Sequence, residues 1–379
     1  MKILLVGEYS RLHNSLKEGL QHLGHDVFLI GHGDDFKDYP VDFKFEPFFS
    51  KGFPKLISNL VYRMFRLNLK SLSFKRQFFK NKELFTCYDI VQLINENPFN
   101  NRPKTEISIL KHIFNHNTNA FLLSCGIDYL SIKYAYHKKL KYSVLSPLFE
   151  NENLKKHYKF ILEKLSPSYI KLHDYVFKNI NGVISSDLDY HIPHLGHNNY
   201  LGMVPNPINT KLIQYIPLSV KDNIVIFHGI NTSSYIRKGN IFFDMALESI
   251  QKKYMENVTV IKTENLPYEE YIKAYDSCHI LLDQVYAHDQ GYNALEAMAR
   301  GKVVFTGAEK EWLDYYHLSE DTVGINALPD ANLIAKKLEW LIQNPEKIIE
   351  ISKNARAFIE REHNYITIAQ KYLDIWKHN

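Results

Sequence analysis

The hydrophobic positions near the start of the chain follow two patterns, one typical of a buried strand and one of a helix. KILLVG (2–7) is a continuous apolar run that ends in glycine, as in strands covered on both faces of a parallel sheet. Leucines at helical spacing then lie within 16–23, and Gly24 stands where a helix commonly ends. DVFLIG (26–31) is a second strand-like run, so the three segments predict a βαβ unit.

The same alternation of strand and helix patterns continues through the rest of the chain. GMVPNPIN (202–209) interrupts it with a short strand and a proline-rich turn, after which the alternation restarts. Further strands are predicted at 88–94, 120–126, 182–187, 223–229, 258–263, 279–285 and 302–307. Helices are predicted at 240–254, 268–278, 331–343 and 367–378.

Two successive α/β halves with one proline-rich joint predict two Rossmann-like domains, each with a parallel sheet, that face each other across a cleft. We expect the first domain to cover residues 1–205, the second 206–355, and a C-terminal helix within 356–379 to cross back to the first domain. Ligands of open parallel sheets bind beside the carboxyl ends of strands, so the loops that follow strands should carry the chemistry.

Composition and cysteine spacing indicate the compartment in which the protein is expected. The chain has 379 residues, 45% of them apolar, and a net charge of +4 that does not by itself indicate a nucleic-acid partner. Its three cysteines, Cys87, Cys125 and Cys278, follow no metal-ligand spacing and fit a reducing compartment. The N-terminal apolar run is too short for a signal peptide, and no run reaches the length of a spanning helix. We expect a cytoplasmic protein whose membrane contact, if it has one, is peripheral.

Segment 51–82 has an unusual charge pattern. It holds nine Lys or Arg and no Asp or Glu, and its apolar residues recur at helical spacing. Two interpretations stay open, a helical segment that packs on its own domain with a solvated basic face, or one that lies on an anionic membrane surface.

Three loops after predicted strands hold candidate site residues. GEYSRLHNS (7–15) lacks the Gly-x-Gly-x-x-Gly pattern of dinucleotide sites, so Gly7 and Glu8 belong either to an acceptor site or to a plain connection. In HGINTSSYIRKGN (228–240), Gly229 allows a tight exit from the strand. Arg237 and Lys238 precede a helix start there, which predicts either an anion site or a solvated turn.

HDQGYNALEAMARG (288–301) is the third loop. Asn293 followed three residues later by Glu296 is typical of a helix cap. A carboxylate near a helix start is also suited to accept hydrogen bonds from a diol such as a ribose. Both interpretations remain open from these residues alone.

Taken together, PNPIN at the joint, RKG after the first strand of the second half, and GYNALEAMARGKVVFTG resemble the glycosyltransferases of the GT-B fold, in particular the large retaining family 4. The resemblance is best over residues 202–310. It implies transfer of a sugar from a nucleotide-diphosphate sugar to an acceptor hydroxyl, with retention and without a metal or other cofactor. It also implies an acceptor-side first domain and a donor-side second domain, in surface polysaccharide or glycolipid synthesis.

The resemblance also implies roles for single residues. Lys238, with Arg237 beside it, would bind the diphosphate, and Glu296 would bind the ribose hydroxyls. The backbone of Gly291, Tyr292, Asn293 and Ala294 would lie against phosphate or donor sugar, and the loop 263–268, with Glu264 and Leu266, would lie by the base.

Two positions depart from the family pattern. His288 stands where the family has the first glutamate of its motif, so it is the candidate contact to the donor sugar. Cys125 stands where members often have a histidine, and we interpret it as a packed small side chain. Asp128 is therefore the polar candidate in that loop. The catalytic candidates are His288, Lys238 and Asp128.

Two other functions share this fold. A GT-B epimerase or phosphorylase would keep the fold and change the chemistry, but no lysine for pyridoxal phosphate is identifiable. A non-catalytic module that binds a nucleotide-sugar or a polysaccharide is the alternative of a different class, and the unusual His288 favours it.

Overall fold

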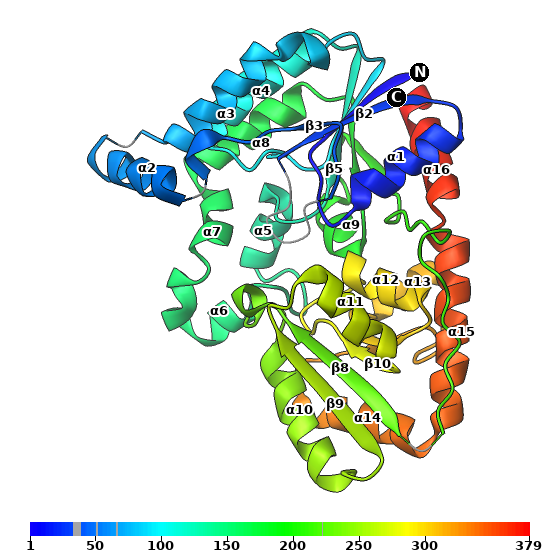
Figure 1. Ribbon diagram of the computed structural model, residues 1–379. Helices are drawn as coiled ribbons and strands as arrows, with labels where there is room; N and C mark the ends of the chain where they lie inside the picture. The colour runs from blue at the N-terminus through cyan, green and yellow to red at the C-terminus, as the bar shows by residue number, and fades with distance from the viewer. Residues whose placement is uncertain (33–38, 51, 66, 222) are drawn as a thin grey trace.

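The computed structural model describes residues 1–32, 39–50, 52–65, 67–221 and 223–379. Two parallel sheets, each with helices packed around it, form an upper and a lower part in Figure 1. The predicted α/β class with two parallel-sheet domains is confirmed.

The first sheet has seven strands, all paired in parallel. They are β1 (Lys2–Val6), β2 (Asp26–Gly31), β3 (Phe43–Lys44), β4 (Ile90–Leu93), β5 (Asn119–Ser124), β6 (Gly182–Ser185) and β7 (Tyr200–Met203). Their order across the sheet is β3-β2-β1-β4-β5-β6-β7. The order reverses direction between β1 and β4, which is where open parallel sheets leave a crevice at the strands' carboxyl ends.

Helices cover both faces of this sheet and extend below it (Figure 1). Proline at the first helical position favours the starts at Pro103 and Pro167, because proline has no N–H to leave unpaired there. The helices are α1 (Leu12–His22), η1 (Phe48–Ser50), α2 (Gly52–Phe65), α3 (Leu69–Lys80), η2 (Lys82–Phe85), α4 (Pro103–Asn115), α5 (Tyr129–Tyr136), α6 (Ser146–Glu150), η3 (Glu152–Lys156), α7 (Lys159–Leu162), η4 (Glu163–Leu165), α8 (Pro167–Lys178) and α9 (Leu188–His194).

The second sheet has five parallel strands in the order β12-β11-β10-β8-β9. They are β8 (Ile224–Ile230), β9 (Val258–Glu264), β10 (Ile280–Leu282), β11 (Val303–Thr306) and β12 (Ile325–Asn326). The helices of this half are η5 (Thr232–Ser234), α10 (Asn240–Lys253), α11 (Tyr268–Ser277), α12 (Tyr292–Ala299), α13 (Lys310–Tyr316), α14 (Ala331–Gln343), α15 (Pro345–Glu362) and α16 (Tyr365–His378).

The last helix crosses back to the first domain, as predicted. α16 packs along α1, and the two ends of the chain lie near each other in Figure 1. Gly19 of α1 allows this close approach, because a Cβ there would lie 2.3 Å from the carbonyl oxygen of Tyr365. The indole N–H of Trp376 donates to Oε1 of Gln92 in β4 (3.1 Å), which ties α16 to the first sheet.

The predicted strands and helices are confirmed within a few residues, and the structure contains further elements that were not predicted. The tail contains three helices rather than two, because Pro345 begins α15 instead of ending a helix. The short edge strands β3 and β12 and the helices between β5 and β6 were not predicted. No helix in the described ranges combines the length and the apolar character needed to span a bilayer.

Candidate functional site

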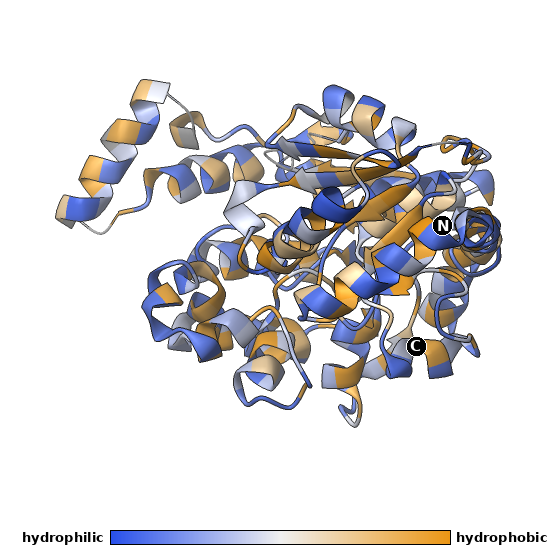
Figure 2. Ribbon diagram, turned by 90° about the horizontal axis from the view of Figure 1, so that it is seen from below, coloured by the Kyte–Doolittle hydropathy of each residue, from blue (hydrophilic) through white to orange (hydrophobic). Residues whose placement is uncertain are grey.

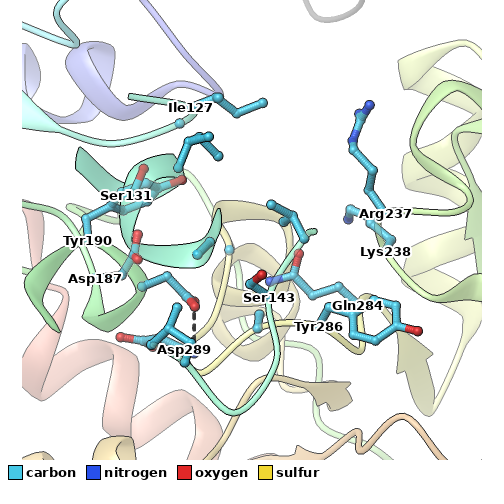
Figure 3. A pocket seen from close by; sticks show the side chains of 18 of the residues that line it. Ile127, Ser131, Ser143, Asp187, Tyr190, Arg237, Lys238, Gln284, Tyr286 and Asp289 are labelled. Carbon is cyan, nitrogen blue, oxygen red and sulfur yellow. Dashed lines mark hydrogen bonds between the residues drawn. The ribbon is translucent and has the colours of Figure 1, made fainter. Parts of the chain in front are cut away.

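A cleft with a volume of about 280 Å³ lies between the two domains (Figure 3). Its first-domain wall includes Ile127 and Tyr190, which follow β5 and β6. Its second-domain wall includes Arg237, Gln290 and Gly291, which follow β8 and β10. The cleft therefore lies at the carboxyl ends of strands from both sheets, where a parallel sheet binds ligands.

Two cations approach this cleft on the loop between β8 and α10. Arg237 and Lys238 line it, and Figure 3 shows both on the side opposite Asp187 and Tyr190. Gly239 caps α10 in the left-handed conformation (φ 69°), and a Cβ there would lie 2.8 Å from Cβ of Val285. Only glycine fits that approach without strain. The predicted position of the cation pair just before a helix start is confirmed.

Lys238 is held by a network in the second domain. Its ammonium pairs with Oδ1 of Asp283 (2.9 Å), and that carboxylate is buried directly after β10. The side-chain amide of Asn293 donates to the same oxygen (3.1 Å), and the Thr306 hydroxyl donates to Oδ2 (3.4 Å). This network holds the half-buried ammonium at the cleft.

Arg237 is positioned by the first domain. Its guanidinium lies 4.8 Å from the ring centre of Phe160 in α7, which is a cation–π contact. Partial burial holds the pKa of Arg237 below its usual range, although an arginine stays protonated under such conditions. The residue predicted to contact phosphate therefore also joins the two domains.

Carboxylates form the first-domain side of the cleft, and they were not predicted. Asp189 accepts the backbone N–H groups of His288 (3.1 and 3.2 Å) and Asp289 (3.3 Å). Asp289 in return accepts the backbone N–H of Leu188 at the start of α9 (3.0 Å). Each domain thus supplies an acceptor for the other's loop.

Burial and mutual repulsion act on these acids. Burial, followed by the nearby Asp289 and Asp189 charges, raises the pKa of Asp187 well above its usual range. Burial also raises the pKa of Asp189 and of Asp289. The sequence signal was SSDLD (185–189) at the carboxyl end of β6, the place that the parallel-sheet rule marks.

Comparisons with known proteins agree with this geometry. Residues 240–374 match the model of a family described as glycosyl transferase-like. A search of curated proteins found no match.

Solved structures align with all or nearly all of the chain. A sucrose-phosphate synthase from Thermosynechococcus elongatus is 16% identical, with a TM-score of 0.60. The alignment covers 100% of this chain and 98% of the synthase chain. HepE of Anabaena in complex with UDP-glucose is 14% identical with a TM-score of 0.58 and full coverage of both chains. A putative UDP-N-acetylglucosamine 2-epimerase from Listeria monocytogenes is 10% identical, with a TM-score of 0.55. The alignment covers 98% of this chain and 94% of the epimerase chain.

The chain has the GT-B fold. The matched family model covers much of the second domain. The matched residues include α10, the helix that follows Arg237 and Lys238, and α12.

His288 does not line the cleft, although it stands where the resemblance places a donor-sugar contact. It is buried, and its ring packs against Tyr142 with centroids 5.2 Å apart. Nε2 donates to the Tyr142 carbonyl oxygen (3.3 Å), and Nδ1 lies 3.6 Å from Glu311. The segment around Tyr142 crosses from the first domain and covers this histidine, so its predicted catalytic role has no direct geometric support.

Glu296 lies in the middle of α12 and is buried. The capping interpretation is wrong, because Gly291 is the N-cap of α12 and Asn293 already lies inside the helix. The side-chain oxygen of Asn293 instead accepts the Tyr271 hydroxyl (3.2 Å). A ribose contact for Glu296 stays a prediction.

The other predicted residues of this loop differ in accessibility. Gly291 lines the cleft at the start of α12, whose first N–H groups can bind an anion. The Tyr292 hydroxyl donates to the Pro207 carbonyl oxygen (2.9 Å) and accepts from the Ser15 hydroxyl (2.8 Å). Ala294 is fully buried. Tyr292 and Ala294 therefore serve packing between domains, while Gly291 faces the ligand space.

Asp128 acts as a helix cap. Its Oδ1 accepts the backbone N–H of Ser131 (2.7 Å) at the start of α5, and the Ser124 hydroxyl donates to Oδ2. It is buried and does not line the cleft, unlike its neighbour Ile127. Cys125 is also buried, and burial raises the pKa of its thiol well above the usual range, so it is a packed side chain.

Gly7 and Glu8 lie in a closed loop after β1. Glu8 accepts the backbone and side-chain N–H groups of Asn14, both at 2.7 Å, and burial raises its pKa to about 8. Gly7 has φ 87°, and a Cβ there would lie 2.3 Å from Ile94. Neither residue lines the cleft.

Gly229, Glu264 and Leu266 lie on or just after the paired strands β8 and β9. Gly229 lies inside β8 rather than after it, and a Cβ there would lie 2.4 Å from the Tyr271 ring. Glu264 ends β9 and is exposed, and Leu266 is half-buried. Asn265 between them bonds to Thr232 through two side-chain hydrogen bonds (2.8 and 3.1 Å), so this loop lies against the loop after β8.

Proposed function

We propose that the protein transfers a sugar from a nucleotide-diphosphate sugar to an acceptor hydroxyl. The observation that carries the proposal is the cation pair Arg237 and Lys238 at the start of α10, on the wall of an interdomain cleft. These side-chain cations and the helix start at Gly291 would together form a site for a diphosphate.

The chemistry follows from where charge develops. As the bond from the anomeric carbon to the phosphate oxygen breaks, negative charge grows on the diphosphate and the sugar gains oxocarbenium character. Preorganised cations stabilise that charge more in the transition state than in the ground state. Lys238, Arg237 and the α12 N-terminus at Gly291 would supply this stabilisation, so the proposal requires no metal and no resident cofactor.

The proposed stereochemical course is retention. The acceptor oxygen attacks the anomeric carbon on the face that the phosphate leaves, and the leaving phosphate oxygen takes the acceptor's proton. The resemblance of residues 291–301 to the retaining family supports this course. His288 would act on the donor sugar only through the loop that it holds.

The proposed setting is surface polysaccharide or glycolipid synthesis in the cytoplasm, peripherally on the inner face of the membrane, with a carbohydrate or lipid-linked acceptor. HepE is described in complexes with UDP and with UDP-glucose, which makes uridine diphosphate the first ligand to test.

Thermal unfolding with nucleoside diphosphates tests the donor site. UDP or GDP should raise the melting temperature, because a ligand of the native state stabilises it. Lys238→Ala and Glu296→Ala should abolish the shift, while Lys252→Ala at the exposed far end of α10 should keep it. A wild-type protein that no nucleoside diphosphate stabilises would contradict the proposal.

A non-catalytic nucleotide-sugar or polysaccharide-binding module is the second candidate. The buried position of His288, outside the cleft, favours it, because the residue at the place of the family's first glutamate does not face the ligand space. Such a module would show the thermal shift but would release no UDP from UDP-glucose with any acceptor extract.

A further inference from the structure

Helix α2 exposes a stripe of large apolar side chains. Phe53, Leu56, Leu60 and Met64 are 73%, 64%, 59% and 65% exposed, whereas Ser58 of the same helix is buried. At about 100° per residue these four side chains form a single stripe about 80° wide. A helix that buries a serine and exposes four large apolar side chains needs an apolar environment on its outer side.

The helix stands away from the body of the molecule. It projects at the left of Figure 1, and Figure 2 shows hydrophobic and hydrophilic positions side by side along it. Its attachment includes a cation–π contact, in which the Arg102 guanidinium lies 5.1 Å from the ring centre of Tyr62. The exposed stripe is therefore accessible without any rearrangement of the core.

The neighbouring helix α3 has the opposite arrangement. Its Phe74 and Phe78 are almost fully buried and stack on Phe45, with centroids 4.5 and 6.1 Å away. The two described helices of this segment thus differ, because α3 buries large aromatic side chains and α2 exposes large apolar ones. The four-residue stripe of Phe53, Leu56, Leu60 and Met64 lies on α2.

The charges around the stripe favour one occupant. Lys55 and Arg63 are exposed on α2, and Lys70, Arg76 and Lys80 are exposed on α3. The sequence from 51 to 82 contains no acidic residue. A second copy of this chain would bring two basic surfaces together, which is unfavourable, whereas an anionic bilayer offers both acyl chains and negative headgroups.

We propose that α2 lies in the plane of an anionic membrane surface, with Phe53, Leu56, Leu60 and Met64 inserted among the acyl chains and the basic residues of α2 and α3 against the headgroups. Long basic side chains reach headgroups from such a position. The inference concerns attachment and does not depend on which reaction the cleft performs.

Vesicle flotation tests the proposal. Wild-type protein should float with vesicles of phosphatidylglycerol and phosphatidylcholine, and less with phosphatidylcholine alone or at high salt. Leu56→Asp with Leu60→Asp should lower the bound fraction by about tenfold or more, because two inserted side chains become charged. Met245→Asp with Met255→Asp is the matched control, since both methionines are exposed in the second domain, and it should float like wild type.

The outcomes separate attachment from folding and from the donor site. The variants change exposed side chains, so their thermal unfolding and any shift with UDP should equal those of wild type. A wild type that stays unbound on anionic vesicles, or a Leu56→Asp/Leu60→Asp variant that floats equally well, would overturn the proposal. Equal binding to uncharged vesicles would overturn the role of the basic residues. A dimeric wild type that the variant makes monomeric, with neither floating, would assign the stripe to a second copy instead.

Discussion

The loops after β1 and after β8 occupy the same place in the two halves of the molecule, yet they differ in use. Each connects the first strand of a sheet to a helix. The loop after β8 turns Arg237 and Lys238 toward the cleft. The loop after β1 turns Glu8 inward, onto Asn14. Topology therefore marks both loops as candidates, and only the side-chain partners decide which one meets a ligand.

Steric contact shapes the loop after β1, whereas electrostatic contacts hold the loop after β8. Gly7 lets the segment near Ile94 press against the first loop, which closes it. In the second loop, Arg237 contacts the ring of Phe160 and Lys238 pairs with Asp283, and both cations line the cleft.

Substitution of Gly7 should disrupt the close packing of the loop after β1. Gly7→Ala introduces a Cβ into contact with Ile94 in a left-handed backbone, so we expect a loss of about 3 kcal/mol in the free energy of unfolding. Gly24→Ala has the same backbone strain (φ 84°) with nothing within 4 Å, so it should cost about 1 kcal/mol. Urea unfolding measures both. Equal losses for the two variants would mean that no steric closure exists.

The inward acid of that loop should be visible in the pH dependence of stability. Burial raises the folded-state pKa of Glu8 to about 8, above the 4.5 of an exposed glutamate, so the folded protein retains the proton at neutral pH. This contribution is complete below about pH 4.5 and is lost as the pH rises through about 8. Glu8→Gln keeps a neutral side chain, so it should exceed wild type by roughly 2 to 4 kcal/mol at about pH 9 and differ little at about pH 4.

Urea unfolding across this pH range measures the effect, with exposed Glu256→Gln as a control that should follow wild type. If Glu8→Gln instead lost sugar transfer while its stability stayed level with wild type at every pH, the first loop would be a site and the comparison would fail.

The smallest expected effect concerns the open loop. Phe160→Ala removes the ring that holds Arg237, and the affinity for UDP should fall about threefold, as expected for a cation–π contact of about 0.5 to 1 kcal/mol. Phe149→Ala removes an equivalent contact to Lys138, at the same 4.8 Å, and should leave the affinity unchanged. Isothermal titration with UDP distinguishes them, and equal effects would show that Phe160 acts only through packing.

Patterns of local origin were predictable from the sequence. The strand at 120–126 and the helix at 240–254 follow from periodicity, because the burial of one strand or one helix face is a local property. The place of Arg237 and Lys238 beside a helix start was also predictable, since the glycine that follows fixes the turn. The fold class followed from the order of these elements.

Features that depend on contacts across the domain interface were not predictable. His288 turns away from the cleft because the segment of Tyr142, far away in the sequence, covers it. Asp189 and Asp289 exchange hydrogen bonds only when the two domains meet. Within the second domain, Asn293 was wrongly predicted as a cap, because its side chain instead donates to Asp283 and accepts from Tyr271.

The return of α16 to α1 bears on how the polypeptide matures during synthesis. Ile368, Tyr372 and Leu373 share a hydrophobic cluster with Leu16 and Leu20, which belong to the opposite end of the chain. While a ribosome is still translating the second half, the α1 face of the first domain lacks its cover. Nascent chains halted before residue 365 should therefore engage chaperones that recognise apolar surface, and release should follow once the final helix emerges.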